Sequence, residues 1–531
     1  MSHPYYITTA IDYVNAAPHL GHAYEKVATD VMARFQRLIG NEVFFLTGTD
    51  EHGIKIEKTA KEKGITPQEH TDRVSQEFIK TWSELNLTYD RFIRTTEKDH
   101  YELVAKLWKK LRDKGDIYKH SYTGLYCSGC EVFMTARDLN ENGECLIHQR
   151  KPDEVQEENW FFKLSSYKQK ILDHIEQHPD FIWPDFRREE VKKMLEELQD
   201  ISVSRPRTTV NWGIPVPDDD EQVIYVWIDA LSNYITGVGC WQDEAKFEKY
   251  WGTQENPNAI HVIGKDILRF HAIYWPAMLL AADLPLPKQV VVHGFINLNN
   301  DKISKSLGNV VSPASLVERF NLPNTDAIRY YLMTVAQFGQ DGNFTEEDFK
   351  LKVNADLANN LGNLLNRTLN MTNKYFEGEI PSSGQDSSLY GGFALPSEKS
   401  MAQVKAFYEG FDFQNAAHEI LNWVDAANAL IASKEPWNLF KENKLEELAS
   451  LMHCVLNTLR QVAIALSPIT PKLAQDIWTQ LGYASSLTAV SWEAIVTVEI
   501  PSRQKVNLQG PILPRLDSEL AGEAKKAKIT Q

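Results

Sequence analysis

Cysteine is scarce in this chain, and long apolar runs are missing from it. Only five of the 531 residues are cysteine, which argues against a fold stapled by disulfides in a chain of this size. No stretch approaches ~18 uninterrupted apolar residues, so no membrane-spanning helix is expected. The first residues lack a charged segment followed by an apolar run, so no signal peptide is expected. These absences predict a cytoplasmic protein without a membrane partner.

The chain also has fewer positively than negatively charged residues. The chain has 56 Lys and Arg residues against 72 Asp and Glu residues, a formal net charge of −16. This balance argues against general affinity for nucleic acids, but it permits a local basic face for a defined RNA such as a tRNA. The hydrophobic fraction of 43% and the charged fraction of 24% are those of an ordinary globular protein. The length suits about three or four domains.

The first fifty residues are typical of a strand, a turn, a helix and a second strand. Residues 5–11 are rich in β-branched and aromatic types. Apolar residues from Leu20 to Leu38 recur at helical steps, and the helix is expected to end at Gly40. The apolar run 43–46 fits a buried parallel strand. This βαβ unit places His19-Leu20-Gly21-His22 at the start of the helix, where open α/β sheets bind nucleotides.

The rest of the chain divides into an interruption of this unit and a helical second half. Residues 118–217 contain a cysteine cluster and two helical runs, which predicts an insertion that splits the nucleotide-binding fold. The sheet is expected to resume at residues 223–227, 259–263 and 289–292. From about residue 349 nearly every segment has helical periodicity, which predicts an α-helical bundle.

A second short signature, Lys302-Ile303-Ser304-Lys305-Ser306, follows the last expected strand. Alone, such a loop is most often just solvated, and a histidine pair at a helix start is most often structural. Here the loop comes after a strand, His293-Gly294 and a turn, which is a long and specific order. Lysine on a flexible stem suits a mobile loop that carries charge to a phosphate. Together the two signatures predict an enzyme in which a carboxylate attacks the α-phosphate of ATP.

The cysteine cluster has the spacing of a structural zinc site. Cys127 and Cys130 form one pair, and fourteen residues later Cys145 and His148 form another. Three thiolates and one imidazole suit tetrahedral zinc without an open position. A redox CxxC would leave Cys145 and His148 unexplained, and incidental cysteines are the other alternative. The predicted fold class is therefore α/β: a split Rossmann-type parallel-sheet catalytic domain with a zinc-knuckle insertion, followed by an all-α domain.

Several aromatic and imidazole side chains flank the expected nucleotide site. Individually each is more simply a core residue. As a set they predict a pocket with aromatic walls and one or two polar tips, which suits a thioether side chain. They are Trp227, Tyr234, Phe270, His271, Tyr274 and Trp275.

With these residues in place, the chain resembles the methionyl-tRNA synthetases of the single-zinc bacterial type, which are class I aminoacyl-tRNA synthetases. The resemblance runs from residue 5 to about residue 466, and its most specific segments are 45–53, 225–231 and 261–278. It implies a methionine–tRNA ligase that activates L-methionine with ATP and Mg²⁺ to methionyl-adenylate. It also implies transfer to the 3′ end of initiator and elongator tRNA(Met), and one structural Zn²⁺.

The resemblance implies roles for individual residues. His19, His22, Lys302 and Lys305 would carry the phosphate chemistry, and Gly21, Gly264, Asp266, His293 and Gly294 would complete the ATP site. The methionine pocket would consist of Ile11, Tyr13, Asp50, Trp227, Ala230, Tyr234 and His271, with Asp50 binding the substrate ammonium. Arg205 with Asp266 would organise the active site, Cys127, Cys130, Cys145 and His148 would bind zinc, and Asn363, Arg367 and Trp437 would contact the anticodon.

The expected domain boundaries follow from the same comparison. The two halves of the catalytic domain are residues 1–117 and 218–292, separated by the insertion at 118–217. Residues 293–348 are the signature-loop and stem-contact region, residues 349–505 the anticodon-binding domain, and residues 506–531 a tail. No C-terminal tRNA-binding dimerisation module follows, so a monomer is expected.

Some features depart from the family pattern, and alternatives stay open. Leu20 and Ile303 replace the commonest apolar residues of the two signatures. Asp12 stands beside the pocket where the family more often carries proline or tyrosine, and the sequence gives no reason for it. Synthetases for branched aliphatic amino acids need an editing insertion for which residues 118–217 leave no room. A cysteine-specific relative and an inactive tRNA-binding paralogue are the remaining alternatives.

Overall fold

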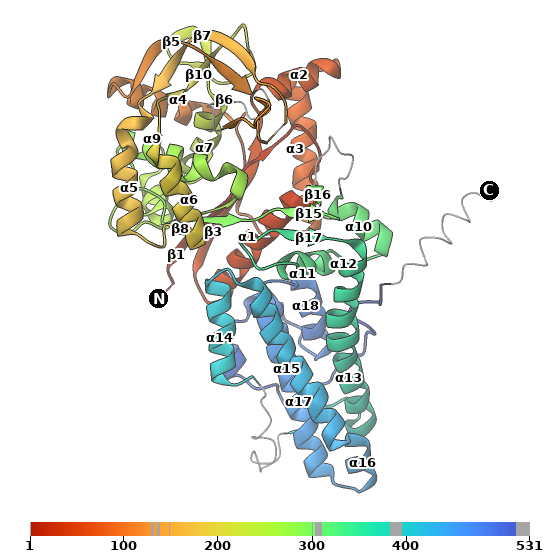
Figure 1. The fold of residues 1–531 in the computed structure, drawn as a ribbon. Coiled ribbons are helices and arrows are strands. Elements are labelled where there is room, and N and C mark those ends of the chain that lie inside the picture. Colours follow the sequence, from red (N-terminus) through yellow and green to blue (C-terminus); the bar gives the residue numbers. More distant parts are fainter. Residues whose placement is uncertain are drawn as a thin grey trace, which may run out of the picture.

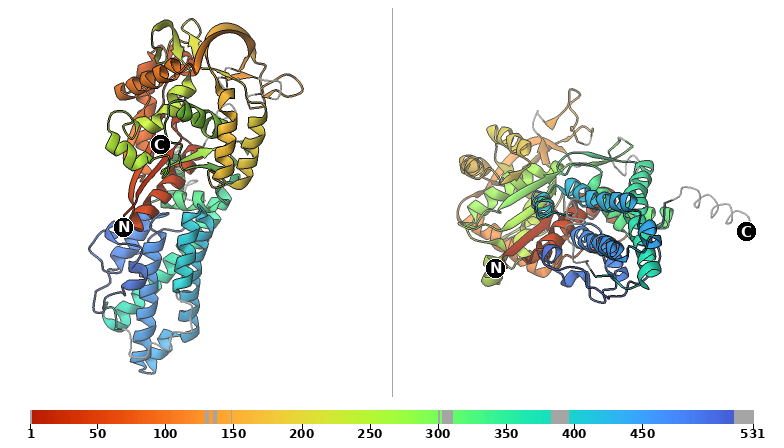
Figure 2. Two further views of the ribbon diagram at one scale, coloured as in Figure 1. Left: turned by 90° about the vertical axis from the view of Figure 1, so that its left-hand side faces the viewer. Right: turned by 90° about the horizontal axis from the view of Figure 1, so that it is seen from below.

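The protein consists of an α/β lobe and a helical lobe placed end to end (Figure 1; Figure 2, left). The computed structural model describes residues 2–127, 129, 132–134, 138–147, 149–299, 301–302, 311–382 and 396–516. Lys305, Cys130 and His148 therefore lie outside the described residues, and only the backbone of Lys302 is described.

A parallel sheet forms the centre of the α/β lobe. Its strand order is β2-β3-β1-β13-β14-β8, with β4 added beside β3. The chain moves outward from β1 in one direction and later returns on its other side, so a switch point lies between β1 and β13, where ligands bind in such sheets. The strands are β1 (Pro4–Thr9), β2 (Asp12–Tyr13), β3 (Glu42–Asp50), β4 (Arg91–Arg94), β8 (Ile182–Trp183), β13 (Ala259–Gly264) and β14 (Gln289–His293).

Helices cover the sheet. The predicted amphipathic helix is α1 (Leu20–Leu38), and its burial along most of its length matches its apolar periodicity. The other helices of this lobe are α2 (Ile54–Glu62), α3 (Pro67–Glu84), α4 (Lys98–Asp113), α7 (Val226–Thr236), α8 (Glu244–Trp251) and α9 (Trp275–Ala281), the last preceded by η3 (Lys265–Ile267) and the π-helical turn η4 (Phe270–Tyr274).

The region predicted as an insertion forms the top of the lobe in Figure 1. An antiparallel sheet in the order β6-β5-β7-β9 is built from β5 (Ile117–Cys127), β6 (Val132–Met134), β7 (Asp153–Phe162) and β9 (Ile201–Ser202). Two helices follow β7, α5 (Lys168–Gln177) and α6 (Asp185–Glu196), the first preceded by η2 (Leu164–Tyr167). Between them β8 pairs with β14, so this region also supplies one edge of the central sheet.

One strand prediction is wrong. Residues 223–227 do not continue the parallel sheet, because β12 (Asp219–Ile224) pairs antiparallel with β10 (Ser204–Pro206) and β11 (Pro215–Val216). The chain then enters α7 at Val226, with Tyr225 as the N-cap residue. A short apolar run fits a strand and the first turn of a buried helix equally well, so periodicity could not separate the two.

The second lobe is the predicted helical bundle. Its long helices are α13 (Asn363–Phe376), α14 (Glu398–Glu409), α15 (Phe413–Lys434), α17 (Leu445–Leu466) and α18 (Pro471–Gln480), with η6 (Asn354–Gly362) before them and α16 (Pro436–Lys441) at the far tip. Among the described residues α17 alone is long and apolar enough to cross a membrane, and 83% of its apolar window is buried inside the protein, as the central helix of a bundle requires.

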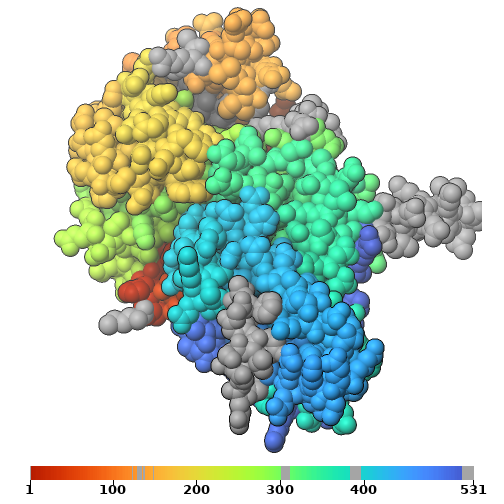
Figure 3. Space-filling model, turned by 60° about the horizontal axis from the view of Figure 1, so that its bottom comes forward, coloured from red at the N-terminus to blue at the C-terminus, as the bar shows by residue number. Residues whose placement is uncertain are grey.

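A connecting region joins the lobes. It contains β15 (Ile296–Leu298), β16 (Asp301–Lys302), α10 (Pro313–Phe320), α11 (Asp326–Thr334), β17 (Gly342–Phe344) and α12 (Glu346–Val353). The buried Arg329 of α11 lies 2.8 Å from Asp30 of α1 and donates to the carbonyls of Leu85, Pro468 and Ile469. One hydrophobic core runs from Ile7 and α1 into the bundle. Figure 3 accordingly shows the green surface of this region meeting the cyan and blue surface of the bundle along a continuous boundary.

Candidate active site

The two histidines of the first signature cap α1. His19 is the N-cap residue, and its Nδ1 accepts a hydrogen bond from the amide of Gly21 at 3.1 Å. In return, His22 Nδ1 accepts from the amide of His19 at 3.2 Å, and the two rings stack 3.8 Å apart. Because Nδ1 accepts in both rings, the proton of each neutral imidazole sits on Nε2, which is therefore a donor. The capping arrangement fixes two such donors beside the helix N-terminus.

Gly21 is required by this cap. A Cβ at position 21 would lie 2.9 Å from Cε1 of His19, closer than carbon atoms approach without a shift. Any larger residue would push the His19 ring off the helix N-terminus. The glycine of the signature therefore shapes the cap itself.

The chain on both sides of the second signature is described. Lys302 lies in β16, paired with Asn297 of β15. Beyond residues 303–310, which lie outside the described residues, the carbonyl of Val311 accepts a hydrogen bond from the amide of Leu20 at 2.9 Å. The chain that follows the second signature therefore contacts the first turn of the helix that carries the first.

The predicted amino-acid pocket is assembled from β1–β2, α7 and η4. Tyr234 Oη lies 2.7 Å from Nε2 of His271, whose Nδ1 lies 3.0 Å from the carbonyl of Ile267. Since a carbonyl only accepts, Nδ1 carries the proton, and Tyr234 donates to Nε2. Burial lowers the pKa of His271 to about 4, so the ring is neutral at physiological pH. The closed end of the pocket is therefore polar but uncharged.

Other members of the predicted pocket lie around these two residues. Trp227 stacks on Phe270 with ring centroids 3.6 Å apart, and Ala230 is buried one turn further along α7. Ile11 precedes β2, and Tyr13 ends it in register with Asp50 at the end of β3. The predicted pocket residues thus form two groups, one on α7 and η4 and one on β2 and β3, and their union in one pocket stays a prediction.

Two buried acids support this pocket and were missed by the sequence analysis. Asp229 of α7 accepts from His52 Nδ1 at 2.6 Å and from His100 Nε2 at 2.7 Å. Although burial raises the pKa of Asp229, the two histidines hold it below its ordinary value. Glu51 is held by Arg94 at 2.7 Å. Asp229 lies two residues after Trp227 and one before Ala230, and this spacing was the available signal.

The predicted partners Arg205 and Asp266 lie in different surroundings. Arg205 is buried, donates to Ser202 Oγ and to the Ser204 carbonyl at 2.7 Å, and lies over the rings of Tyr126 and Tyr225. Asp266 is exposed at the start of η3. It lies close to Gly264, where a Cβ would come within 2.6 Å of its carboxylate. Their joint role stays a prediction.

A further buried cluster links the two parts of the site. Lys26 Nζ lies 2.6 Å from Asp12 Oδ1 and 2.9 Å from Glu25 Oε1. Glu25 Oε2 in turn lies 3.0 Å from Nε2 of His293, at the end of β14. Next to it, Gly294 passes so close to Gln340 that a Cβ would lie 2.3 Å from that backbone. Asp12, unexplained by the sequence, is thus the partner of a buried lysine.

Known proteins share both the sequence and the architecture of this chain. The family "tRNA synthetases class I (M)" matches residues 5–146 and 136–369, and "Anticodon-binding domain of tRNA ligase" matches residues 398–512. A methionine–tRNA ligase of Caldanaerobacter subterraneus subsp. tengcongensis is 43% identical over 99% of this chain and 82% of its own length. One from Thermosynechococcus vestitus is 44% identical over 91% of each chain. The chain belongs to the methionyl-tRNA synthetase family. It is accordingly an aminoacyl-tRNA synthetase, a ligase.

Solved structures agree with this assignment. The Mycobacterium tuberculosis methionyl-tRNA synthetase in complex with methionyl-adenylate is 37% identical and has a TM-score of 0.90, covering 97% of this chain and 100% of that one. The free form of the same enzyme gives a TM-score of 0.84. The methionyl-tRNA synthetase family and the α/β fold followed by a helical domain are therefore confirmed, while the zinc knuckle stays a prediction. Neither a cysteine-specific relative nor an inactive paralogue is favoured.

The predicted zinc ligands of the synthetase are described only in part. Cys127 at the end of β5 and Cys145 are both buried, and they pack with Met134 and Leu139 in a very small apolar cluster. Within the described residues no group of three or more metal-ligating side chains occurs.

The predicted anticodon residues lie on the surface of the bundle. Asn363 and Arg367 are exposed one turn apart on α13, and Arg367 donates to Asn428 of α15 at 2.8 Å. Trp437 in α16 is 40% exposed, so it is not a core residue of the bundle. Phe440, equally exposed, stacks on Tyr375.

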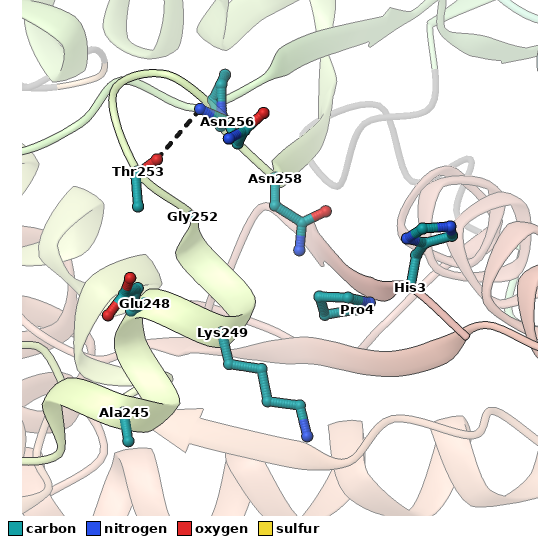
Figure 4. Close-up of a pocket in the computed structure, with 10 residues that line it drawn as sticks. His3, Pro4, Ala245, Glu248, Lys249, Gly252, Thr253, Asn256 and Asn258 are labelled. Carbon is teal, nitrogen blue, oxygen red and sulfur yellow. Dashed lines mark hydrogen bonds between the residues drawn. The ribbon is translucent and has the colours of Figure 1, made fainter. Parts of the chain in front are cut away.

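A groove of about 630 Å³ lies at the opposite end of the central strands, beside the start of β1 (Figure 4). His3, Lys249, Thr253 and Asn258 line it, and Thr253 Oγ1 accepts from the amide of Asn256. It contains none of the predicted catalytic residues. Parallel sheets bind ligands at the carboxyl ends of their strands, which this groove does not adjoin.

Proposed function

We propose that this synthetase activates L-methionine with ATP to methionyl-adenylate and transfers the methionyl group to initiator and elongator tRNA(Met). The observation that carries the proposal is the hydrogen bond between the amide of Leu20 and the carbonyl of Val311, which ties the chain that follows the lysine signature to the helix capped by His19 and His22. Two imidazole donors and two loop lysines can then face one polyphosphate. Such fixed donors and charges stabilise the negative charge that develops when a carboxylate attacks phosphorus.

In the first step, the methionine carboxylate forms a bond to the α-phosphorus and pyrophosphate leaves. His19 and His22 donate through Nε2 to phosphate oxygens, and Lys302 and Lys305 neutralise the departing pyrophosphate. Gly264, Asp266, His293 and Gly294, at or just after the ends of β13 and β14, complete the ATP site with Gly21. Mg²⁺ enters with ATP and adds positive charge at the phosphates. In the second step, the terminal ribose hydroxyl of the tRNA attacks the adenylate carbonyl and AMP leaves.

Specificity for methionine follows from the neutral end of the pocket. Tyr234 commits its proton to His271, so the closed end presents no formal charge to the side chain. A thioether tolerates this environment because it is apolar and only weakly accepting. Ile11, Tyr13, Trp227 and Ala230 form the remaining walls, Asp50 binds the ammonium, and Arg205 with Asp266 organises the site.

The insertion would bind one structural Zn²⁺ through Cys127, Cys130, Cys145 and His148. The burial of Cys127 and Cys145 in one cluster supports this, since sulfur atoms that lie together away from water can bind one metal ion. Metal analysis of the purified protein should find about one zinc per chain. Cys145→Ser should lose the metal and destabilise the insertion, and zinc-free wild-type protein would contradict the assignment.

The bundle would recognise the anticodon through Asn363, Arg367 and Trp437, since exposed aromatic and Arg side chains suit single-stranded bases. We further propose that the synthetase acts in the cytoplasm as a monomer. The domain boundaries at residues 117, 217, 292, 348 and 505 belong to this proposal as well. Light scattering on the purified protein tests the oligomeric state.

ATP–pyrophosphate exchange with each of the twenty amino acids tests the proposed reaction directly. Methionine alone should support exchange. Lys305→Ala should slow exchange by about 2–4 kcal/mol of barrier, by analogy with the deletion of a transition-state donor, while methionine affinity stays unchanged. Exchange with another amino acid in place of methionine would contradict the proposal, and a rate loss below about fivefold would remove Lys305 from its role.

A further inference from the structure

Lys26 is the centre of a buried cluster of ionisable side chains. Its ammonium has three partners: Asp12 Oδ1 at 2.6 Å, Glu25 Oε1 at 2.9 Å and the carbonyl of Ala10 at 3.0 Å. The side chains of Lys26, Asp12 and Glu25 each have less than a tenth of their surface exposed. A lysine ammonium has three protons to donate, so every one of them is used.

The first side of the cluster faces the amino-acid pocket. Asp12 lies in β2 between Ile11 and Tyr13, and β2 is in register with Thr49 and Asp50 of β3. Ala10 begins the same segment, and its amide donates a hydrogen bond to the carbonyl of Val262 in β13. Lys26 therefore holds both the backbone and a side chain of the segment that forms one pocket wall.

The second side of the cluster faces His293 and Gly294, which belong to the proposed ATP site. Glu25 contacts Lys26 with Oε1 and His293 with Oε2. His293 also has Nδ1 2.7 Å from the carbonyl of Gly294. Both partners of this ring are acceptors, so both contacts are hydrogen bonds only when the ring carries two protons. A Cβ on Gly264 would lie 3.7 Å from the His293 ring, which places this end of the cluster beside the end of β13.

Stability alone does not account for this arrangement. Burying charged groups costs more than filling the same volume with hydrocarbon, even when the charges are paired. Asp12 also leaves its Oδ2 buried without a hydrogen-bond partner among the described residues. An imperfectly satisfied buried ion pair is retained more readily when its geometry has a use.

We propose that Lys26, held by Asp12 on one side and by Glu25 on the other, is a positioning residue that couples the amino-acid pocket to the nucleotide site. The proposal rests on the assignment of Ile11 and Tyr13 to the methionine pocket. Methionine that packs against this wall fixes Asp12, and thereby Lys26, Glu25 and His293. ATP then binds a site that is already ordered, so each substrate strengthens the binding of the other.

Calorimetric titration of the full-length protein at pH 8 tests the coupling. The dissociation constant of methionine is measured alone and with saturating α,β-methylene ATP, which binds without reacting. In the wild type the analogue should tighten methionine binding at least fivefold. In Asp12→Asn, which keeps the shape but removes the charge, this ratio should fall to within twofold of one. Methionine binding without nucleotide should stay within about threefold of the wild-type value.

The matched control is Lys249→Met. Lys249 and Glu42 form an ion pair of the same length, 2.6 Å, but this pair lies beside the groove at the other end of the sheet (Figure 4). Its removal should leave the ratio unchanged. A wild-type ratio of one, or an Asp12→Asn ratio equal to the wild type, would overturn the coupling while leaving the proposed reaction intact. A wild type that binds no methionine would overturn the pocket assignment and the coupling with it.

Discussion

The two lobes bury very different side chains. The α/β lobe and its connecting region bury Asp12, Glu25, Lys26, Asp229 and Arg329, each with a charged partner or a histidine. In the described part of the bundle no Asp, Glu or Lys is buried, and Arg460 is its only buried charge apart from His453. The bundle instead keeps its recognition candidates on the surface, as Trp437 shows.

This contrast follows from what each lobe must hold still. Chemistry at a phosphate needs donors fixed to within fractions of an ångström, and buried ion pairs and hydrogen bonds provide such fixation at a cost in stability. A bundle that presents side chains to a flexible RNA loop needs only a rigid scaffold, which hydrocarbon packing supplies more cheaply. Substitution of the buried charged residues of the α/β lobe should therefore lower stability and catalysis together. Substitution of the exposed residues of the bundle should lower only the affinity for tRNA.

The largest effect is expected where the lobes meet. Arg329→Met leaves the buried Asp30 with one cationic partner instead of two, and it leaves three backbone carbonyl groups without their hydrogen-bond donor. The free energy of unfolding should therefore fall by about 3–5 kcal/mol. Arg460→Met is the matched control in the bundle, because Arg460 donates to the carbonyls of Ala494 and Ile495 and to Asn457, but to no acid. Its cost should be about 1–3 kcal/mol. Equal losses in denaturant titrations would remove the contrast.

The second effect depends on pH. Burial raises the pKa of Asp12 from 3.8 to about 7, with Glu25 adding to the rise and Lys26 opposing it. The folded protein thus binds this proton more tightly than the unfolded chain, so stability falls as the pH rises from about 4 to 7. At about 1.4 kcal/mol per pKa unit, the effect amounts to about 4 kcal/mol at most.

In Asp12→Asn the free energy of unfolding should not show this decrease with rising pH, because asparagine does not titrate. The variant should melt close to the wild type at pH 4 and above it at pH 8.5, while losing the substrate coupling. Melting curves at several pH values measure this difference. A variant that is less stable than the wild type at pH 8.5 would show that the ion pair with Lys26 stabilises the fold, contrary to our expectation.

Asp229→Asn should affect the pocket more than the nucleotide site. The asparagine can accept a hydrogen bond from only one of the two histidines. Loss of the other hydrogen bond should lower the free energy of unfolding by about 1.5–3 kcal/mol, as expected for a hydrogen bond to a charged group. Since Trp227 and Ala230 share α7 with Asp229, the KM for methionine should rise while the KM for ATP changes little. Thr236→Val removes only the second contact of His100, at 3.0 Å, and should leave both constants close to the wild type.

The smallest effect is expected at the tip of the bundle. Trp437→Ala should weaken tRNA binding by about 1–3 kcal/mol, as expected for the loss of one stacking platform, with methionine activation and melting temperature unchanged. Phe440→Ala is the control, because Phe440 is equally exposed on the same helix but stacks on Tyr375. Parallel loss of activation and aminoacylation in Trp437→Ala would contradict a recognition role.

Sequence patterns predicted the elements that have strong periodicity. The amphipathic α1, the apolar strands β13 and β14 and the bundle helices α15 and α17 lie close to their expected positions, because burial of one face or of both dictates their residues. The strand predicted at 223–227 was wrong, because a short apolar run without periodicity fits a strand and a buried helix equally well. That His19, His22 and Lys302 act at one site stays a prediction from the order of the motifs. The contact of Asp229 with His100 and that of Glu25 with His293 could not be predicted, because contacts across 129 and 268 residues depend on how strands and helices are placed in three dimensions.

The continuous hydrophobic core that joins α1 to the bundle makes the two lobes a single unit in unfolding. Ile7, Phe35, Tyr408 and Leu466 belong to one cluster, and Phe35 stacks on Tyr408 across the boundary at 4.8 Å. A cut between the lobes would expose apolar surface on both sides, so neither half can be expected to persist alone. Heating should therefore give one calorimetric transition for both lobes, and a fragment containing only the bundle should aggregate.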